Sequence, residues 1–271
     1  MLVPVLYKLL IMNFDTELKS FSSISLKEMD AVMLLNRQDS KFLFKCDKLK
    51  EVLTQIKLQY KVLQIDDKRS FKYDNLYFDT NDFLFYSLHH NGKLNRHKVR
   101  FRKYLDTDIN FLEVKFKNNK GKTKKSRVQA RNLQEKLTEK SKNFIASNNI
   151  NLDTGKLNPK LWVYYQRTTF VNKKMSERLT IDLNLKFKNY ATGVELSLPH
   201  LVILEVKQDR LTVGDNMLDF FREKKMIASS FSKYCMGINL LYPEVKHNNF
   251  KKNVLFLNKM HDTDVRHTIS K

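Results

Sequence analysis

Arginine and lysine residues alternate along several short segments of this sequence, in a pattern suited to holding phosphate groups. Arg100 and Arg102 stand two positions apart in the segment KVRFRKYL. Successive side chains of a strand point to opposite faces, so both guanidinium groups would lie on one face. Each guanidinium can form two parallel hydrogen bonds with a phosphate. Two such groups at this spacing are suited to successive phosphates of one ligand.

Three further segments alternate in the same way, with one charged and one apolar face: FLEVKFK (111–117), RLTIDLNL (178–185) and VILEVKQ (202–208). Cations greatly outnumber carboxylates on the candidate binding faces. The cations are Lys41, Arg100, Arg102, Lys115, Arg167, Arg178 and Lys207, against Glu113, Glu205 and Asp182. The few carboxylates would suit a divalent cation, because hard cations take oxygen ligands and share them with substrate phosphates.

Two arrangements would explain these charged faces. One is a half-buried antiparallel sheet whose polar face meets solvent. The other is a closed barrel whose charged faces point inward, with the apolar faces outward under helices. The excess of cations is unlike a solvent-exposed mixture and favours the barrel. The short spacing between strands favours antiparallel pairing, and the predicted fold class is α+β.

Helices are expected between and beside these strands. Ser25 and Glu28 form a capping-box pattern at the start of one helix. Apolar residues at helical spacing predict a second helix from Asp47 onward. Residues 133–147 and 215–225 are two further helical stretches.

The composition restricts the class of protein. The 271 residues include 50 Lys and Arg against 29 Asp and Glu, a net charge of +21, and 42% are hydrophobic. This is enough apolar material for a core, so the chain is not mainly disordered. The charge suits a polyanionic partner, but a lysine-rich surface would give the same total. Two cysteines exclude a disulfide framework and fit a reducing cytoplasm.

Several other features predict little chemistry. No stretch is long and apolar enough for a membrane span, and MLVPVLYKLLIM lacks the marks of a signal peptide. Met12 is an alternative start, which would make residues 1–11 an artefact. We expect His89 and His90 to be exposed, because they lack partners at metal-ligand spacing. Cys46 has no histidine near it in the sequence that would indicate a thiol nucleophile.

Eight segments in order resemble the VTC (vacuolar transporter chaperone) domain, a polyphosphate polymerase branch of the CYTH-like triphosphate tunnel metalloenzymes. They are RQDSKFLF (37–44), NLYFDTNDFLFY (75–86), KVRFRKY (98–104), FLEVKFK (111–117), NPKLWVYYQRTTF (158–170), RLTID (178–182), LEVK (204–207) and FSKY (231–234). Single segments are weak signals, but their shared order is specific. The resemblance makes residues 33–242 the tunnel domain, after an N-terminal segment (1–32) and before a basic C-terminal tail (243–271).

The resemblance implies an eight-stranded antiparallel β-barrel, the triphosphate tunnel, flanked by helices. It implies binding of ATP with Mn²⁺ or Mg²⁺, transfer of the γ-phosphate to a growing polyphosphate chain, and release of ADP. The expected partners are ATP, polyphosphate and a separate membrane protein for export, with no nucleic acid. Two alternatives stay open: hydrolysis of triphosphates in the same tunnel, and binding of polyphosphate or inositol phosphates without turnover.

The resemblance also assigns residues to the site. The matching phosphate-binding cations are Lys41, Arg100, Arg102, Lys115, Arg167, Arg178 and Lys233, with Tyr165 and Ser232 as polar contacts and Glu205 as metal ligand. A further basic position falls on Lys125 or Arg127. Lys207 joins the set as a substrate-binding candidate, and Glu113 as a second metal ligand or a partner that orients lysines. The ExExK strand of tunnel enzymes reads Arg37, Asp39, Lys41 here, with one carboxylate, which weakens the case for metal binding on it.

Overall fold

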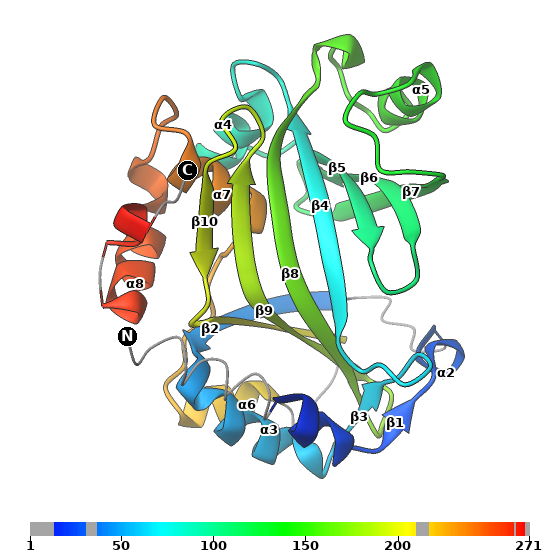
Figure 1. Cartoon of the computed structure of the whole chain (residues 1–271), viewed down its shortest axis with the longest axis vertical. Helices are drawn as coiled ribbons and strands as arrows, with labels where there is room; N and C mark the ends of the chain where they lie inside the picture. The colour runs from blue at the N-terminus through cyan, green and yellow to red at the C-terminus, as the bar shows by residue number, and fades with distance from the viewer. Residues whose placement is uncertain (1–13, 31–36, 210–216, 263, 269–271) are drawn as a thin grey trace. The chain divides into compact units, whose positions relative to one another are not determined.

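The computed structural model describes residues 14–30, 37–209, 217–262 and 264–268 of an α+β chain (Figure 1). Its strands are β1 (Ser23–Ile24), β2 (Arg37–Lys45), β3 (Tyr60–Leu63), β4 (Phe71–Asp79), β5 (Arg96–Tyr104), β6 (Ile109–Lys117), β7 (Thr123–Ala130), β8 (Asn158–Asn172), β9 (Glu177–Asn189), β10 (Glu195–Leu198) and β11 (Leu201–Asp209). Its helices are α2 (Leu26–Asp30), α3 (Leu49–Lys57), α4 (Leu84–His90), α5 (Glu139–Ala146), α6 (Met217–Glu223), α7 (Lys233–Leu241) and α8 (Lys251–His261).

The strands form one eleven-stranded sheet with the order β2-β11-β9-β8-β4-β5-β6-β7, to which β1, β3 and β10 are added. β4, β5, β6 and β7 pair antiparallel in that order, as do β2, β11 and β9, whereas β1 and β3 pair parallel. The order ends at β2 and β7 in the described part of the chain, so the sheet is open. The predicted closed, eight-stranded barrel is therefore wrong in strand number and in closure. Alternation shows that a strand has two different faces, but it does not show which strand edges are paired.

The chain divides into two compact units. Unit 1 contains the residues up to Phe71, Gln166–Asn184 and Pro199–Phe231, and unit 2 contains Lys72–Tyr165, Leu185–Leu198 and the residues from Ser232 onward. The long strands β8 and β9 contribute residues to both units.

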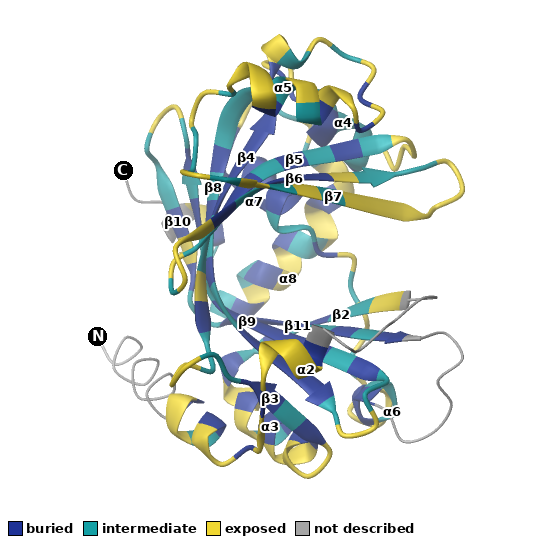
Figure 2. Cartoon of the chain, turned by 90° about the vertical axis from the view of Figure 1, so that its right-hand side faces the viewer, coloured by how far each residue is buried: buried dark blue, intermediate teal, exposed yellow. Residues whose placement is uncertain are grey.

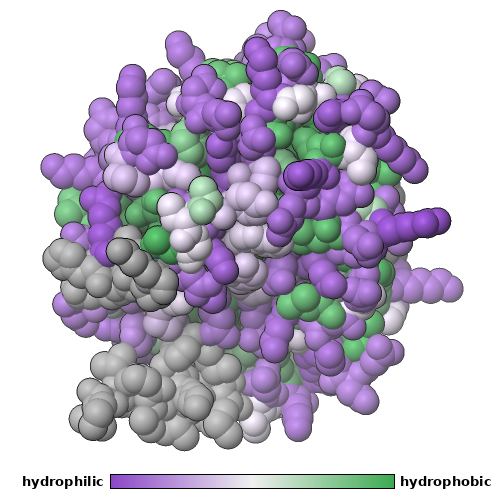
Figure 3. All heavy atoms as spheres, turned by 45° about the horizontal axis from the view of Figure 1, so that its top comes forward, coloured by the Kyte–Doolittle hydropathy of each residue, from purple (hydrophilic) through white to green (hydrophobic). Residues whose placement is uncertain are grey.

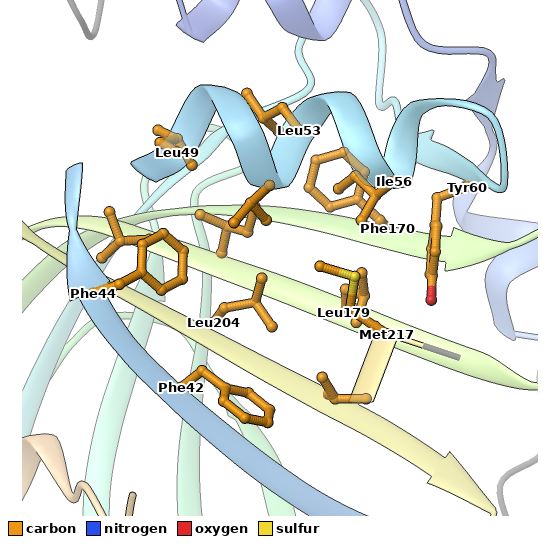
Figure 4. Close-up of a cluster of buried hydrophobic side chains, with 14 of the residues drawn as sticks. Phe42, Phe44, Leu49, Leu53, Ile56, Tyr60, Phe170, Leu179, Leu204 and Met217 are labelled. Carbon is orange, nitrogen blue, oxygen red and sulfur yellow. The ribbon is translucent and has the colours of Figure 1, made fainter. Parts of the chain in front are cut away.

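In unit 1, helix α3 covers the apolar face of the strands (Figure 4), and α6 contributes Phe220 and Phe221 to the same cluster. Leu179 of β9 and Leu204 of β11 belong to a buried cluster with Leu53 of α3 and Phe221 of α6. Burying such a side chain stabilises a fold by roughly 1.5–3 kcal/mol. The predicted helix after Asp47 and the predicted alternation of β9 and β11 are confirmed.

Unit 2 has its own core on the apolar face of β4, β5 and β6. Val99, Phe101 and Leu112 are buried there against Ile145 of α5. Helix α5 is shorter than the predicted stretch 133–147, because the hydroxyl of Thr138 accepts the amide of Ser141 at 3.3 Å and caps the helix. The predicted helical covering of the apolar faces is thus confirmed within each unit.

Helices α4 and α7 of unit 2 were not predicted. The buried carboxylate of Asp79, at the end of β4, accepts the amides of Phe85 and Tyr86 at 2.9 Å each and so caps α4. The Tyr234 hydroxyl of α7 donates to the same carboxylate. Around Gly237, α7 packs so closely that an added Cβ would lie 2.5 Å from a methyl group of Leu161.

The remaining expectations concern the two ends of the chain and its surface. The Glu28 carboxylate accepts the Ser25 amide at 2.9 Å, so the capping box at α2 is confirmed. The segment predicted as a tail (243–271) contains α8, which buries Leu257 and Met260. Met12 and residues 1–11 lie outside the described residues.

Hydrophilic side chains cover most of one face of the molecule (Figure 3). None of the described helices is long and apolar enough to cross a bilayer.

Candidate functional site

The polar face of β4–β7 in unit 2 carries half of the predicted cations. Tyr77, Arg100, Glu113 and Arg127 are successive partners in the register of the four strands. Directly paired residues share a face, so alternate residues of each strand extend this face in both directions. On β5, β6 and β7 it carries one carboxylate, Glu113, and eight cations: Arg96, Lys98, Arg100, Arg102, Lys115, Lys117, Lys125 and Arg127.

Four of these residues form what we call the arginine cluster: Arg100, Arg102, Glu113 and Lys125. The Arg100 Nη2 and Nε atoms lie 2.6 and 2.8 Å from Glu113 Oε2. Lys125 Nζ lies 2.8 Å from Glu113 Oε1, and Arg102 Nη1 lies 3.8 Å from the same oxygen. Three cations therefore surround one carboxylate, which leaves a net charge of +2 in the cluster.

Neighbouring polar groups fix the two guanidinium groups in place. Arg100 donates to the Tyr77 hydroxyl at 2.7 Å. Arg102 is buried, and it donates to the Asn75 amide oxygen at 3.0 Å and to the Tyr165 hydroxyl at 3.1 Å. Groups that are held before a ligand arrives do not have to be reoriented when charge develops on it.

The cluster strongly perturbs its own titrating groups. Burial acts to raise the pKa of Glu113, but Arg100, Arg102 and Lys125 outweigh it and hold the pKa well below its usual range. Burial, together with the charges of Arg102 and Arg100, lowers the pKa of Lys125 to about 8, although Glu113 acts in the opposite direction. Glu113 is therefore ionised at neutral pH, while Lys125 is partly deprotonated just above it.

The other predicted residues of unit 2 lie around this cluster. Lys115 and Arg127 are exposed on the same face of β6 and β7, where much of β7 is exposed (Figure 2). Lys233 Nζ lies 4.6 Å from the centre of the Tyr165 ring. The Ser232 hydroxyl caps α7 and accepts a hydrogen bond from Lys98 at 2.8 Å.

Unit 1 brings together a second set, which we call the glutamate cluster: Lys41, Glu205 and Lys207. Glu205 pairs with Lys41 in the register of β11 and β2. Its carboxylate oxygens lie 3.4 Å from Lys41 Nζ and 2.9 Å from Lys207 Nζ. Burial acts to raise the pKa of Glu205, but Lys207, Lys41 and Arg167 hold it well below the usual range.

Arg167 and Arg178 of unit 1 have different partners. Arg167 binds Asp182 with two parallel contacts, Nε to Oδ1 at 2.5 Å and Nη2 to Oδ2 at 2.7 Å. Arg178 stands opposite Lys207 in the register and donates to the backbone carbonyl of Met29 at 2.9 Å. The Asp182 pair fixes the plane of the Arg167 guanidinium.

The carboxylates differ in their suitability for a divalent cation. No group of three or more His, Cys, Asp or Glu side chains gathers as a metal site in the described ranges. Both carboxylates have cations at both oxygens, but the Glu113 side chain is only 2% exposed and lies among three cations, which fits the predicted orienting role better than metal binding. Glu205 is ionised and keeps 14% of its side chain exposed. This single carboxylate fits an ion that takes its other ligands from phosphates and water.

Sequence reasoning missed two residues that hold the arginines of the arginine cluster in place. Asn75 and Tyr77 alternate along β4, and this pattern was the available signal for both.

The structure also corrects two expectations. His90 is buried and His89 is only half exposed. His200 Nδ1 lies 3.8 Å from Cys46 Sγ, yet burial raises the pKa of that thiol, which is the opposite of an activated nucleophile.

The comparison with domain families decides the assignment. The VTC domain model matches residues 36–242. This chain belongs to the VTC domain family. The match extends over both units and includes every residue of the arginine and glutamate clusters. A comparison with curated proteins finds no match.

Two solved structures are similar to this VTC domain at low identity. HpAC1 from Hippeastrum, described with a dominant triphosphatase activity, is 15% identical, with 73% of this chain and 93% of that chain covered and a TM-score of 0.44. A protein from Pyrococcus horikoshii OT3 is 13% identical, with 74% and 95% covered and a TM-score of 0.42. The family assignment depends on the domain match alone.

Proposed function

We propose that this VTC domain is a metal-dependent polyphosphate polymerase that transfers the γ-phosphate of ATP to a growing polyphosphate chain and releases ADP. The observation that supports it most is the arginine cluster, in which Arg100, Arg102 and Lys125 surround the single carboxylate of Glu113. Such an excess of fixed, half-buried positive charge is suited to a multiply charged anion. The sequence resemblance to polyphosphate polymerases supplies the reaction.

Phosphoryl transfer depends mainly on positioning and on stabilising charge at the transferred oxygens. Arg100 and Arg102 would bind phosphate oxygens, held in orientation by Glu113, Tyr77 and Asn75. Arg167 and Arg178 would bind further oxygens, and Lys41, Lys115 and Lys233 would neutralise the triphosphate or guide the product. Tyr165, Ser232, Lys207 and Arg127 complete the proposed contacts.

Glu205 would hold the divalent cation, Mn²⁺ or Mg²⁺, together with oxygens of the substrate. Such an ion would neutralise charge that develops on the phosphate oxygens. The chain would supply the carboxylate of Glu205 as the ligand, and Lys41 and Lys207 keep this carboxylate ionised.

The deciding experiment incubates the purified chain with ATP and Mn²⁺ or Mg²⁺ and measures ADP, free phosphate and polyphosphate length. We expect long polyphosphate and ADP, with one phosphate added to the polymer for each ADP released. Release of free phosphate without polymer would support the triphosphate hydrolase. An absence of ATP consumption would support the binding-only alternative.

Two variants belong to the same assay. We expect Arg100→Ala and Glu205→Gln each to lower the rate by roughly 10²–10³, because the first removes a cationic contact to the reacting phosphates and the second removes the carboxylate that would hold the divalent cation. The matched control is Lys103→Ala, which removes a cation from the opposite face of β5. Near-normal turnover in both site variants would contradict the site assignment, provided that circular dichroism shows intact folding.

A further inference from the structure

Helix α8 has an apolar side that the core of unit 2 does not use. Val254, Leu257 and Met260 are buried at intervals of three residues and attach the helix to the rest of unit 2. By contrast, Leu255 is 55% exposed and Phe256 is 41% exposed. The VTC domain model matches residues 36–242, so the family assignment gives this helix no role.

The turn before α8 holds the helix in one orientation. The ring of Phe250 is buried, with its centre 5.5 Å from that of His90 and 5.9 Å from that of Tyr86 in α4. Asn249 donates to His90 twice, from its backbone amide at 3.2 Å and from its side chain at 2.8 Å. Because the buried side is fixed in this way, the exposed side of α8 is held facing outward.

Lysines surround the two exposed apolar side chains. Lys252 and Lys259 are each three or four positions from both Leu255 and Phe256, and residues at this spacing lie on one side of a helix. Lys251 is four positions before Leu255, and all three lysines are exposed (Figure 2). Helix α8 contains no aspartate or glutamate. We call these five residues the α8 stripe.

Apolar side chains next to lysines are typical of helices that lie in the surface of a membrane. The alkyl stem of a lysine packs against apolar groups, while its ammonium group stays at the level of the lipid phosphates. At a rise of 1.5 Å per residue, the 11 residues of α8 span about 16 Å. The helix is too short to cross a bilayer, but it can lie flat on one.

An acidic protein partner fits the α8 stripe less well. A stable protein interface covers roughly 800 Å² on each partner. The stripe offers two large apolar side chains, and even an aromatic side chain buries only about 150–250 Å². A lipid surface needs no matching shape, and its negative charge complements the three lysines.

We propose that the α8 stripe binds the surface of an anionic phospholipid membrane. Leu255 and Phe256 enter the boundary between headgroups and acyl chains, and the lysines contact lipid phosphates. This contact belongs to the chain itself and needs no separate membrane protein. It is independent of the proposed function, because it uses no residue of the arginine or glutamate cluster.

The test measures co-sedimentation of the full chain with vesicles of phosphatidylcholine, either alone or with about one third phosphatidylserine. We expect binding to the charged vesicles only. Leu255→Ser with Phe256→Ser should lower the affinity by about tenfold or more. The matched control is Leu58→Ser with Ile227→Ser, which removes two apolar residues of unit 1 that are 79% and 86% exposed. This control should stay within about twofold of wild type.

A second pair of variants tests the charge. Lys252→Ser with Lys259→Ser should weaken binding to the charged vesicles by about thirtyfold. The control is Lys50→Ser with Lys57→Ser, which removes two exposed lysines from α3 and should stay within about threefold. Equal losses in these two variants would show that the net charge of the chain alone attracts the vesicles, and would overturn the α8 stripe as a site.

Two other results would also overturn the proposal. One is equal binding to charged and uncharged vesicles, or unchanged binding of Leu255→Ser with Phe256→Ser. The other is an absence of wild-type binding to charged vesicles, which would favour the acidic protein partner. Circular dichroism melting without vesicles shows whether each variant is folded.

A spectroscopic readout separates insertion from simple adsorption. Phe256→Trp keeps an aromatic side chain in the stripe, and the spectrum of the wild type, which contains only Trp162, is subtracted. We expect the emission of the added tryptophan to shift to shorter wavelength with charged vesicles and to stay unchanged with phosphatidylcholine alone. An unshifted emission from vesicle-bound protein would overturn the insertion of Phe256.

Discussion

At the residue scale, the main feature is that single carboxylates organise several cations. Glu113 contacts Arg100, Arg102 and Lys125, and it holds them close together while leaving an excess of positive charge. Glu205 does the same for Lys41 and Lys207. Without such a carboxylate, the cations would repel one another and move apart. We propose an orienting role for Glu113 rather than metal binding, because its side chain is only 2% exposed.

The lowered pKa of Lys125 leads to a prediction about pH. Since Lys125 loses its charge as the pH rises through about 8, affinity for tripolyphosphate should fall over this range. In Lys125→Arg, the guanidinium stays charged over this range. The loss of affinity that comes from titration of the protein should therefore disappear. Calorimetry of both proteins between neutral and alkaline pH corrects for titration of the ligand itself.

A further variant tests the cause. Glu113 raises the pKa of Lys125, so Glu113→Gln should move the fall in affinity to lower pH. An identical pH profile in the wild type and in Lys125→Arg would show that Lys125 is not the titrating group.

At the scale of elements, the antiparallel register determines which charges meet. The pairing of β5 with β6 places Arg100 opposite Glu113, and a shift by one residue would move Arg100 and Arg102 to the apolar face. Helix α7 completes this part of the site, since its first residues are Ser232, the cap, and Lys233 beside Tyr165.

The close packing of α7 predicts a stability effect at Gly237. A Cβ there would lie 2.5 Å from a methyl of Leu161 and 2.8 Å from a ring atom of Phe187. Gly237→Ala should therefore destabilise the chain by about 1–3 kcal/mol, as overpacking does. Urea denaturation measures the change, with the exposed Lys252→Ala on α8 as a control expected within about 0.5 kcal/mol of wild type. Equal stability of the two variants would show that α7 has room to move.

At the scale of the whole molecule, each of the two units carries one cluster. If both clusters contribute to binding, tripolyphosphate should raise the melting temperature, because a ligand present at 100 times its Kd adds about 2.7 kcal/mol. Arg100→Ala in the arginine cluster of unit 2 and Arg167→Ala, whose charge acts on Glu205 in unit 1, should each reduce this rise, measured against the variant's own ligand-free melting temperature. A reduction in only one variant would limit binding to one unit.

The sequence by itself determined the strand faces, the family and most of the candidate residues. Alternation is a local property, because it follows from the geometry of a single strand. It placed Arg100, Arg102 and Glu113 on one face, and Leu179 and Leu204 on buried faces, as the structure has them.

Only the tertiary structure decided which side chains and which elements contact one another. The three cations around Glu113, the bidentate pair of Arg167 and Asp182, and the open order of the sheet all depend on contacts between different elements. Helices α4 and α7 were missed for the same reason. Asp79 and Tyr234 are far apart in the sequence, and the contact between them exists only after the chain has folded. Pairing across such distances leaves no local pattern in the sequence.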